Sequence, residues 1–213
     1  MTMTTTGPVL LCAATRWEEQ PLSRLSGDGV RLLRTGIGPE NARESLASVS
    51  GVRMIVSTGF AGALQPGMAS GDLVLDLQGL DSDLPPMARE IAQRQGTPIH
   101  FGRIAHTDAV LFRPEQKLAL GKKERAAAVD MESAALRQAA ERLGVPFLAA
   151  RVVLDSLNDR LPSKVPNGET FVDLASYAIA NWRELPVMMS TASLQRRAAA
   201  RLAPFLKELI PVL

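Results

Sequence analysis

Residues 144–156 read GVPFLAARVVLDS, and the fold is inferred outward from this stretch. Gly144 follows a helical stretch at 131–143, and glycine is the common residue just past the end of a helix. Pro146 then opens the apolar run from Phe147 to Leu154, which predicts a strand covered on both faces. The run ends in Asp155, so the sequence places a carboxylate at the carboxyl end of a buried strand.

The same alternation of apolar runs and amphipathic stretches extends over the rest of the chain. Further strands are predicted at 9–14, 30–34, 54–58, 73–77, 99–107 and 126–129, and helices at 17–25, from Pro39, from Pro114 and at 131–143. Glycines at 59–62 are expected to break the strand that begins at Met54, and the Asp-Leu-Pro-Pro region at 83–86 to close the segment after 73–77. Two helical stretches, from about residue 172, follow a loop rich in Pro, Asn and Gly at 162–168.

This alternation predicts an α/β fold. We expect a three-layer α/β/α arrangement with a central mixed, mostly parallel sheet, because strands that alternate with helices form parallel sheets wrapped by helices. No linker divides the chain, so residues 1–213 are interpreted as a single domain whose C-terminal helices are packed on it or form an appendage.

Composition excludes several classes of protein. Hydrophobic residues make up 46% and charged residues 22% of the 213 residues, which is typical of a globular protein. Because 24 Lys and Arg nearly balance 22 Asp and Glu, the chain has no electrostatic footprint for nucleic acid. A single cysteine, Cys12, excludes an internal disulfide and a Cys cluster for zinc, and two histidines are too few for a His-rich metal site.

No membrane segment is predicted, since no run approaches the roughly 18 apolar residues that a membrane span needs. The first seven residues are rich in Thr, without the basic start and apolar core of a signal peptide. We therefore expect a soluble, cytoplasmic protein.

Four polar clusters follow predicted strands, at 18–19, 57–64, 129–133 and 151–156. Each also has a simple structural explanation: acids stabilise helix starts, glycines form tight turns, and Asp130, Glu132 or Asp155 can cap a helix. The glycines match neither a dinucleotide fingerprint nor a P-loop. Together, however, the clusters place several carboxylates at the edge of the sheet where open α/β sheets bind ligands.

These motifs resemble the nucleoside phosphorylase/nucleosidase superfamily, of the purine nucleoside phosphorylase family 1 type, which includes methylthioadenosine/adenosylhomocysteine nucleosidase and futalosine hydrolase. The resemblance covers about residues 9–160 in the family's order. It rests on the sequences TGIG at 35–38, STGFAGAL at 57–64, GD at 71–72, VDMES at 129–133 and VPFLAARVVLD at 145–155. After Asp155 the chain looks most like the hopanoid-associated phosphorylases, through DRLP at 159–162, LP at 185–186 and the helical stretch with Arg196 and Arg197.

The resemblance implies roles for individual residues. Asp155 would be the general acid that protonates N7 of the purine, and Glu18, or Glu19 beside it, would activate water. Glu132 would bind the ribose hydroxyls, and Met131 would lie against the sugar. The remaining substrate-binding candidates are Val110 and Leu111 at the base, and Ser57, Gly59 and Phe60 in the glycine-rich segment.

One departure from the family pattern concerns the aromatic contact with the base. The aromatic residue usual beside the base is missing, and Phe112 is near enough to replace it. Arg151, in the strand that ends at Asp155, is expected to pair with a carboxylate and so hold the strand, rather than to touch substrate.

The identity of the acceptor stays open. Phosphorylases need an anion site of Arg and Ser around the glycine-rich turn, but Ser57 stands where one branch has Arg, and Phe60 replaces the common Ser. Arg34, Arg43 and Arg103 are the candidates to compensate. The resemblance implies no metal and no organic cofactor, with phosphate possible as co-substrate, and it implies a homodimer.

The leading functional hypothesis is cleavage of the N-glycosidic bond of a 5′-substituted purine nucleoside, with release of adenine and with an adenosylhopane-type phosphorylase favoured. The alternative is methylthioadenosine/adenosylhomocysteine nucleosidase or futalosine hydrolase, which use water and differ in the 5′ pocket. Apolar residues of the last helices are candidates to line that pocket. A hypothesis of another class is a non-catalytic nucleoside-binding protein, which a salt bridge of Asp155 away from the cleft would support.

Overall fold

The apolar run at 147–155 forms the centre of the sheet in a computed structural model that describes residues 7–27, 29–159 and 185–213. Strand β8 (Phe147–Asp155) pairs in parallel with β3 (Met54–Ala63) and antiparallel with β4 (Leu73–Asp76). Alternate residues of β8 enter two different hydrophobic clusters, with Val152 in one and Val153 in the other, and both are fully buried. The prediction of a strand covered on both faces is therefore confirmed.

The strands around β8 complete a mixed sheet. The others are β1 (Val9–Ala13), β2 (Val30–Arg34), β5 (Ile99–Phe101), β6 (Arg103–His106) and β7 (Ala126–Asp130). The described residues form an eight-stranded sheet in the order β2-β1-β3-β8-β4-β5, with β7 paired to β3 and β6 paired to β7. Only the β3–β7 and β4–β8 pairings are antiparallel among those described, so the sheet is mostly parallel, as predicted.

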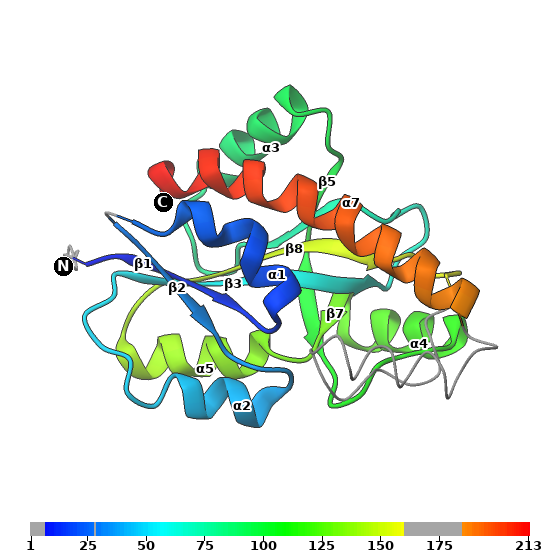
Figure 1. Ribbon diagram of the computed structural model, residues 1–213, viewed down its shortest axis with the longest axis horizontal. Helices are drawn as coiled ribbons and strands as arrows, with labels where there is room; N and C mark the ends of the chain where they lie inside the picture. Colours follow the sequence, from blue (N-terminus) through cyan, green and yellow to red (C-terminus); the bar gives the residue numbers. More distant parts are fainter. Residues whose placement is uncertain (1–6, 28, 160–184) are drawn as a thin grey trace.

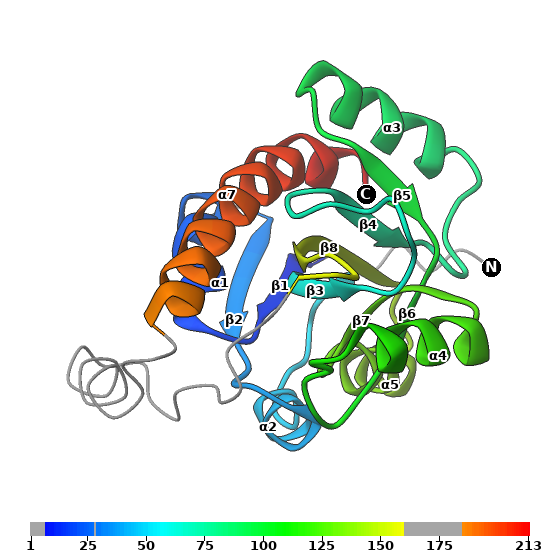
Figure 2. The same cartoon turned by 90° about the vertical axis from the view of Figure 1, so that its right-hand side faces the viewer.

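Helices cover both faces of this sheet (Figure 1). Helices α2 (Pro39–Ser45) and α5 (Ser133–Leu143) lie on one face, and α1 (Arg16–Leu22), α3 (Leu84–Arg94) and α7 (Leu185–Leu209) lie on the other. Figure 2 shows α7 and α1 side by side across that second face, with α4 (Pro114–Glu124) next to β6 and β7. Short 3-10 turns follow α1 at Ser23–Leu25 and α7 at Ile210–Val212. The three-layer prediction is confirmed.

Local signals account for the helix ends. Pro39 and Pro114 each occupy the first turn of a helix, where the absent N–H costs no hydrogen bond. Gly144 ends α5 in the left-handed conformation, with φ of 66°.

Cys12 is buried in β1, and burial raises the pKa of its thiol to about 12.

The predicted break at 59–62 is wrong, because β3 runs on to Ala63. The strand changes its register with β8 at Ala61 and Gly62, and its last two residues also pair with β7. Gly59 has φ of 129°, and a Cβ there would lie 2.2 Å from a carboxylate oxygen of Glu18. The glycines thus allow the strand to bend and a side chain to approach closely, without ending the strand.

One further strand, the start of one helix and one whole helix also differ from the predictions. The strand expected at 99–107 is two strands separated at Gly102, because β5 pairs with β4 and β6 pairs with β7. The helix expected from Met131 begins at Ser133. Helix α3 was not predicted, although Pro85 and Pro86 in its first turn fit a helix start.

Part of the C-terminal prediction lies outside the described residues. This part comprises the loop at 162–168, residues 160–162 of the DRLP motif and the start of the helices near 172. The described portion is α7, whose side chains are described from Ser193 and which buries Leu202, Phe205 and Leu206 against the sheet.

Candidate active site

A cavity of about 490 Å³ lies at the carboxyl ends of the parallel strands, within the size range of small-molecule sites. The described residues that line it come from the segments after β1, β2, β6 and β7, from α4, and from the ends of β3, β7 and β8. They are Ala14, Thr15, Glu18, Ile37, Phe60, Ala61, Gly62, Thr107, Val110, Leu111, Lys117, Val129, Asp130, Met131, Glu132, Leu154 and Asp155. The position agrees with the general rule for open α/β sheets.

Glu18 holds the start of α1 and reaches across to the end of β3. Its Oε2 accepts hydrogen bonds from the Thr15 backbone N, at 2.8 Å, and from Thr15 Oγ1, at 3.0 Å. The Glu18 backbone N donates in turn to Thr15 Oγ1 at 3.3 Å, and the two backbone bonds form a capping box. Its Oε1 accepts a hydrogen bond from the Phe60 backbone N at 2.7 Å. The three bonds to the carboxylate leave room for one more donor, since a carboxylate accepts about four.

Arg151 lies beneath the cavity with a side chain 1% exposed. Its Nη2 is 2.6 Å from Asp130 Oδ2 and 3.8 Å from Glu132 Oε2. The guanidinium also donates to the Thr58 carbonyl at 2.8 Å and to Ser57 Oγ at 2.7 Å. Arg151 therefore neutralises the buried carboxylates of this floor and does not line the cavity, in agreement with the pairing expected from the sequence.

Glu132 lines the cavity between β7 and α5. Its Oε1 accepts a hydrogen bond from the Gly38 backbone N at 2.8 Å, which ties the turn after β2 to the start of α5. Burial raises the pKa of this carboxyl, and the nearby Arg151 guanidinium opposes that shift. The capping role proposed for Asp130 is present, since its Oδ1 accepts from the Ser133 backbone N at 3.1 Å, whereas Glu132 makes no such bond.

Asp155 ends β8 in a buried ion pair at the cavity wall. Its Oδ2 accepts a hydrogen bond from Lys117 Nζ, and the side chains of both residues are at most 5% exposed. Burial raises the pKa of Asp155, and the Lys117 ammonium opposes that shift. The pair lies in the cavity wall and not away from the cleft, so the arrangement that would favour a non-catalytic protein is absent for these two residues.

The structure brings together seven of the nine candidate residues. Those that line the cavity are Asp155, Glu18, Glu132, Met131, Val110, Leu111 and Phe60. Ser57 and Gly59 do not line it: the Ser57 hydroxyl is fully buried against Arg151 and Ser133, and Gly59 lies beneath the Glu18 carboxylate. The contact with substrate predicted for these two residues has no support in this geometry.

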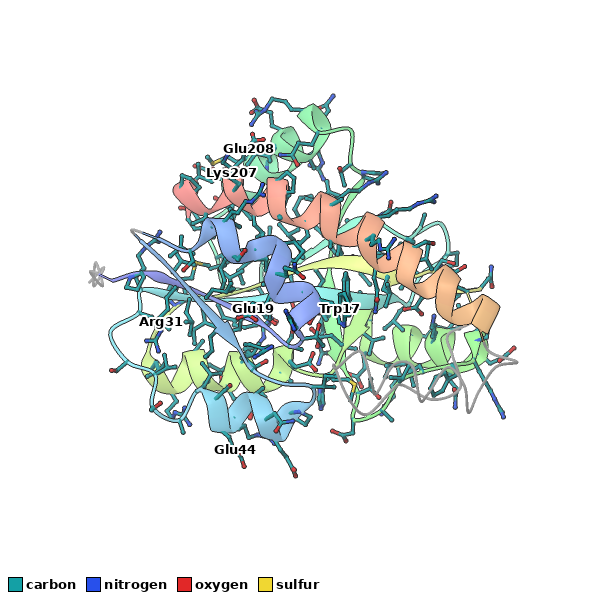
Figure 3. All side chains as sticks on the ribbon, viewed as in Figure 1. Trp17, Glu19, Arg31, Glu44, Lys207 and Glu208 are labelled. Atoms are coloured by element: carbon teal, nitrogen blue, oxygen red, sulfur yellow. The ribbon has the colours of Figure 1, made fainter. Side chains whose placement is uncertain are left out.

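Two secondary candidates, Phe112 and Glu19, do not line the cavity. Phe112 is 38% exposed and does not line the cavity, so Phe60 is the aromatic residue that the described cavity contains. Glu19 lies on α1, where Figure 3 labels it, and its carboxylate is 3.7 Å from Arg34. Glu18 is thus the acid of this pair that reaches the cavity.

Sequence reasoning missed Lys117, Thr15 and Ile37. Thr15 had a readable signal, because Thr15 and Glu18 form the Thr-x-x-Glu spacing of a capping box. Lys117 had none, since a lysine in a polar helix is read as solvent-exposed until the packed face of that helix is known.

The arginines considered for an anion site do not reach the cavity. Arg34 and Arg103 lie near Glu19 and Glu124, and neither these two nor Arg43 lines the cavity. Lys117 is the one cationic side chain that lines the cavity among the described residues, and its Nζ is already paired with Asp155.

No metal centre or membrane span is found in the described part of the chain. No three or more His, Cys, Asp or Glu side chains there are grouped so as to hold a metal ion. None of the described helices combines the length and apolar character that crossing a membrane requires.

Fold and cavity together define an α/β enzyme that binds a small molecule between apolar walls and several carboxylates. The family model of the phosphorylase superfamily matches residues 22–78 and 77–181. The chain therefore belongs to the phosphorylase superfamily, as its motifs predicted. It is an enzyme of the nucleoside phosphorylase and nucleosidase class, which cleaves N-glycosyl bonds.

Relatives by sequence carry two kinds of activity in their names. The chain is 26% identical over 166 residues to the 5′-methylthioadenosine/S-adenosylhomocysteine nucleosidase of Staphylococcus haemolyticus, covering 64% of this chain and 73% of that protein. It is 30% identical over 176 residues to the DeoD-type purine nucleoside phosphorylase of Streptococcus pyogenes, covering 70% and 73% respectively.

Solved structures share the fold. Futalosine hydrolase of Helicobacter pylori aligns with a TM-score of 0.72 at 20% identity, over 97% of this chain and 98% of that one. The Neisseria meningitidis 5′-methylthioadenosine/S-adenosylhomocysteine nucleosidase, in complex with methylthio-immucillin-A, gives 0.72 at 21% identity over 97% and 99%. The hopanoid-associated assignment stays a prediction.

Proposed function

We propose that this protein is a purine nucleosidase, which uses water to cleave the N-glycosidic bond of a 5′-substituted adenosine and releases adenine. The observation that carries this proposal is the 2.7 Å hydrogen bond from the Phe60 backbone N to Glu18 Oε1. A phosphorylase would need this part of the glycine-rich segment to bind an anion. Here the Glu18 carboxylate already accepts the hydrogen bond of the Phe60 backbone amide.

Charge around the cavity supports water as the acceptor. Glu18, Asp130 and Glu132 line the described cavity, and a phosphate dianion near them would be repelled. The Arg151 guanidinium beneath them is paired with Asp130 at 2.6 Å. A neutral water molecule is not repelled in this way, and the Glu18 carboxylate can still accept a hydrogen bond from it.

The proposed reaction uses two carboxyl groups, Asp155 at the end of β8 and Glu18 on α1. As the C1′–N9 bond breaks, its electron pair moves to the purine, and Asp155 gives its proton to N7. The oxygen of water bonds to C1′, and the proton that this water loses goes to Glu18. The raised pKa of Asp155 suits the first role, since a general acid must be protonated near neutral pH.

Binding of the nucleoside is assigned to the remaining walls. Val110 and Leu111 would contact the base with Phe60, and Met131 would contact the sugar. The Glu132 carboxylate would accept hydrogen bonds from the ribose hydroxyls, and charge-assisted bonds of this kind orient as well as bind. The described side chains of α7 do not line this cavity, and the 5′ pocket expected from the last helices stays a prediction.

Product analysis in ¹⁸O-labelled water tests the proposal. The protein is incubated with 5′-methylthioadenosine, adenosine and an adenosylated lipid, with and without phosphate. We expect adenine to be released without phosphate and one ¹⁸O atom to appear at C1 of the free sugar. Mass spectrometry of the sugar and chromatography of adenine measure both products.

The same assay contains the outcomes that would contradict the proposal. A sugar 1-phosphate, formed only when phosphate is added, would show a phosphorylase of the kind that the Streptococcus pyogenes relative is named for. Absence of adenine release from all three compounds would contradict the substrate class. The homodimer implied by the resemblance stays a prediction.

The role assigned to Glu132 predicts a change in substrate binding at acidic pH. Because its pKa is raised, Glu132 gains a proton as the pH falls through that pKa, at a higher pH than an ordinary Glu. The neutral carboxyl is a weaker acceptor for the ribose hydroxyls, so KM should rise on the acidic side. Glu132→Gln should raise KM by about tenfold or more at neutral pH and remove this pH dependence.

Steady-state kinetics from pH 5 to pH 8 measure this effect, with Glu124→Gln on the far end of α4 as the control. Glu124 pairs with Arg103 and does not line the cavity. A KM that does not depend on pH in the unsubstituted protein would contradict the role of Glu132.

A further inference from the structure

Lys117 is a lysine with almost no exposure to solvent. It lies on α4, its residue is 1% exposed, and its Nζ donates to Asp155 Oδ2 and, at 2.8 Å, to the Ser156 carbonyl. Lysine is among the residues that are almost never fully buried unless paired, because removing an ammonium group from water is energetically costly. Its position therefore needs an explanation beyond solubility or helix propensity.

The packing of α4 directs Lys117 to the end of β8. Gly121 lies one helical turn after Lys117, and a Cβ at Gly121 would be 2.8 Å from the Leu64 carbonyl oxygen. The absence of a side chain at Gly121 thus lets α4 lie close to the end of β3. The Lys117 side chain from the same face of the helix meets the Asp155 carboxyl group at the cavity wall.

Packing alone would not require a charge at this position. A buried ion pair often contributes no more stability than apolar side chains of the same volume, because both charges are desolvated. A methionine could fill the space of the Lys117 stem and join α4 to the sheet. What a lysine adds is a fixed positive charge and two directed hydrogen bonds at the proposed acid.

We propose that Lys117 is a positioning residue for the general acid Asp155: it holds Oδ2 in place and stabilises the carboxylate that remains after Asp155 has protonated the purine. This inference rests on the proposed function. It deepens that function by assigning a role to a residue of α4, an element that supplies neither of the two reacting carboxyl groups.

The proton balance of the step is simple. In the reactive form, Asp155 has taken up a proton before bond cleavage, and Lys117 is an ammonium that still donates to Oδ2. When the C1′–N9 bond breaks, the proton passes from Asp155 to N7 of the leaving base, and Lys117 keeps all of its protons. The products of this step are N7-protonated adenine and a carboxylate–ammonium pair, so the positive charge of Lys117 makes proton donation more favourable.

Other charged groups around the pair are the same in every variant proposed below. Asp159, in the loop after β8, raises the pKa of Asp155, in the same direction as burial does. The remaining charged residues of the described cavity and its floor are Glu18, Asp130, Glu132 and Arg151. A shift of the pKa of Asp155 in the Lys117 variants can therefore be attributed to the loss of the Lys117 charge.

Lys117→Met is the direct test, with Lys117→Arg as the conservative variant. Loss of the positive charge raises the pKa of Asp155, so the acid stays protonated to higher pH. The basic limb of the pH profile of kcat/KM should move up by about 1–3 pH units. At neutral pH kcat should fall by about 10–100-fold with little change in KM, since the weaker acid is less able to donate. Lys117→Arg should keep the limb near its original position.

Lys123→Met is the matched control, because Lys123 lies on the same helix with a side chain 79% exposed. It should leave the pH profile and kcat unchanged. Should Lys117→Met fail to fold, Lys117→Gln removes the charge but keeps a hydrogen-bond donor, and the same upward shift of the basic limb is expected. Circular dichroism and the melting temperature report folding for each variant.

A double variant separates an effect through Asp155 from a purely structural one. In an Asp155→Asn background, Lys117→Met should lower kcat little further, because the acid through which Lys117 acts is already gone. A lowered melting temperature with an unmoved basic limb, or full additivity of the two substitutions, would overturn the inference. If the unsubstituted protein releases no adenine, the proposed function itself fails, and this inference fails with it.

Discussion

Asp155→Asn should lower kcat by about 10²–10⁴-fold, the range that a general acid contributes. Asparagine has nearly the shape of aspartic acid but no proton to give to N7, so adenine would have to leave as an anion. The amide oxygen can still accept the hydrogen bond from Lys117, and the fold should be retained. Adenine release at 25 °C and the circular dichroism spectrum measure the two parts of this prediction.

Asp83→Asn is the control, because Asp83 is exposed at the start of α3 and its side chain makes no capping hydrogen bond. Its kcat should equal that of the unsubstituted protein. Near-normal turnover of Asp155→Asn, with the fold intact, would refute the acid role. A loss of helical signal at 25 °C would instead show that Asp155 is needed for folding.

Arg151→Met should lower the free energy of unfolding by about 3–5 kcal/mol, the usual cost of breaking a buried ion pair by removing one partner. Asp130 would be left as an uncompensated buried charge, and the Ser57 hydroxyl and the Thr58 carbonyl would each lose a donor. For a protein of this size, this corresponds to roughly 6–20 °C in melting temperature. Urea denaturation followed by circular dichroism gives the free energy directly.

Arg103→Met provides the comparison on the surface. The Arg103 side chain is 57% exposed and lies 3.3 Å from Glu124, and such exposed pairs contribute about 0–1 kcal/mol. Adding Asp130→Asn to Arg151→Met should recover part of the lost stability, since the unpaired charge is then removed. Equal effects of Arg151→Met and Arg103→Met would contradict the role of Arg151 as the charge that neutralises the cavity floor.

Much of the fold could be predicted because its signals are local. The apolar run that ends at Asp155 is a buried strand, and Pro39, Pro114 and Gly144 mark helix ends as expected. The predictions failed where the meaning of a local signal depends on distant neighbours. The glycines at 59–62 look like a turn, but they belong to a bent strand that meets both β8 and β7.

The candidate site shows the same division. That carboxylates would gather at one edge of the sheet followed from strand ends alone, and Glu18, Glu132 and Asp155 do line one cavity. Ser57 was expected there too, yet its hydroxyl faces Arg151. Adjacent residues of a strand point to opposite faces, so the side that a residue near a bend faces cannot be read from its position in the sequence.

The sequence by itself determined most of the strands and helices, and with them the edge where the acidic residues meet, because hydrophobic periodicity is a property of short segments. Only the tertiary structure decided which charge faces which partner. Lys117 meets Asp155 across 38 positions of the chain, and Glu18 meets the Phe60 amide across 42. Electrostatic energies depend on separations of a few ångströms and on burial, and packing alone sets both.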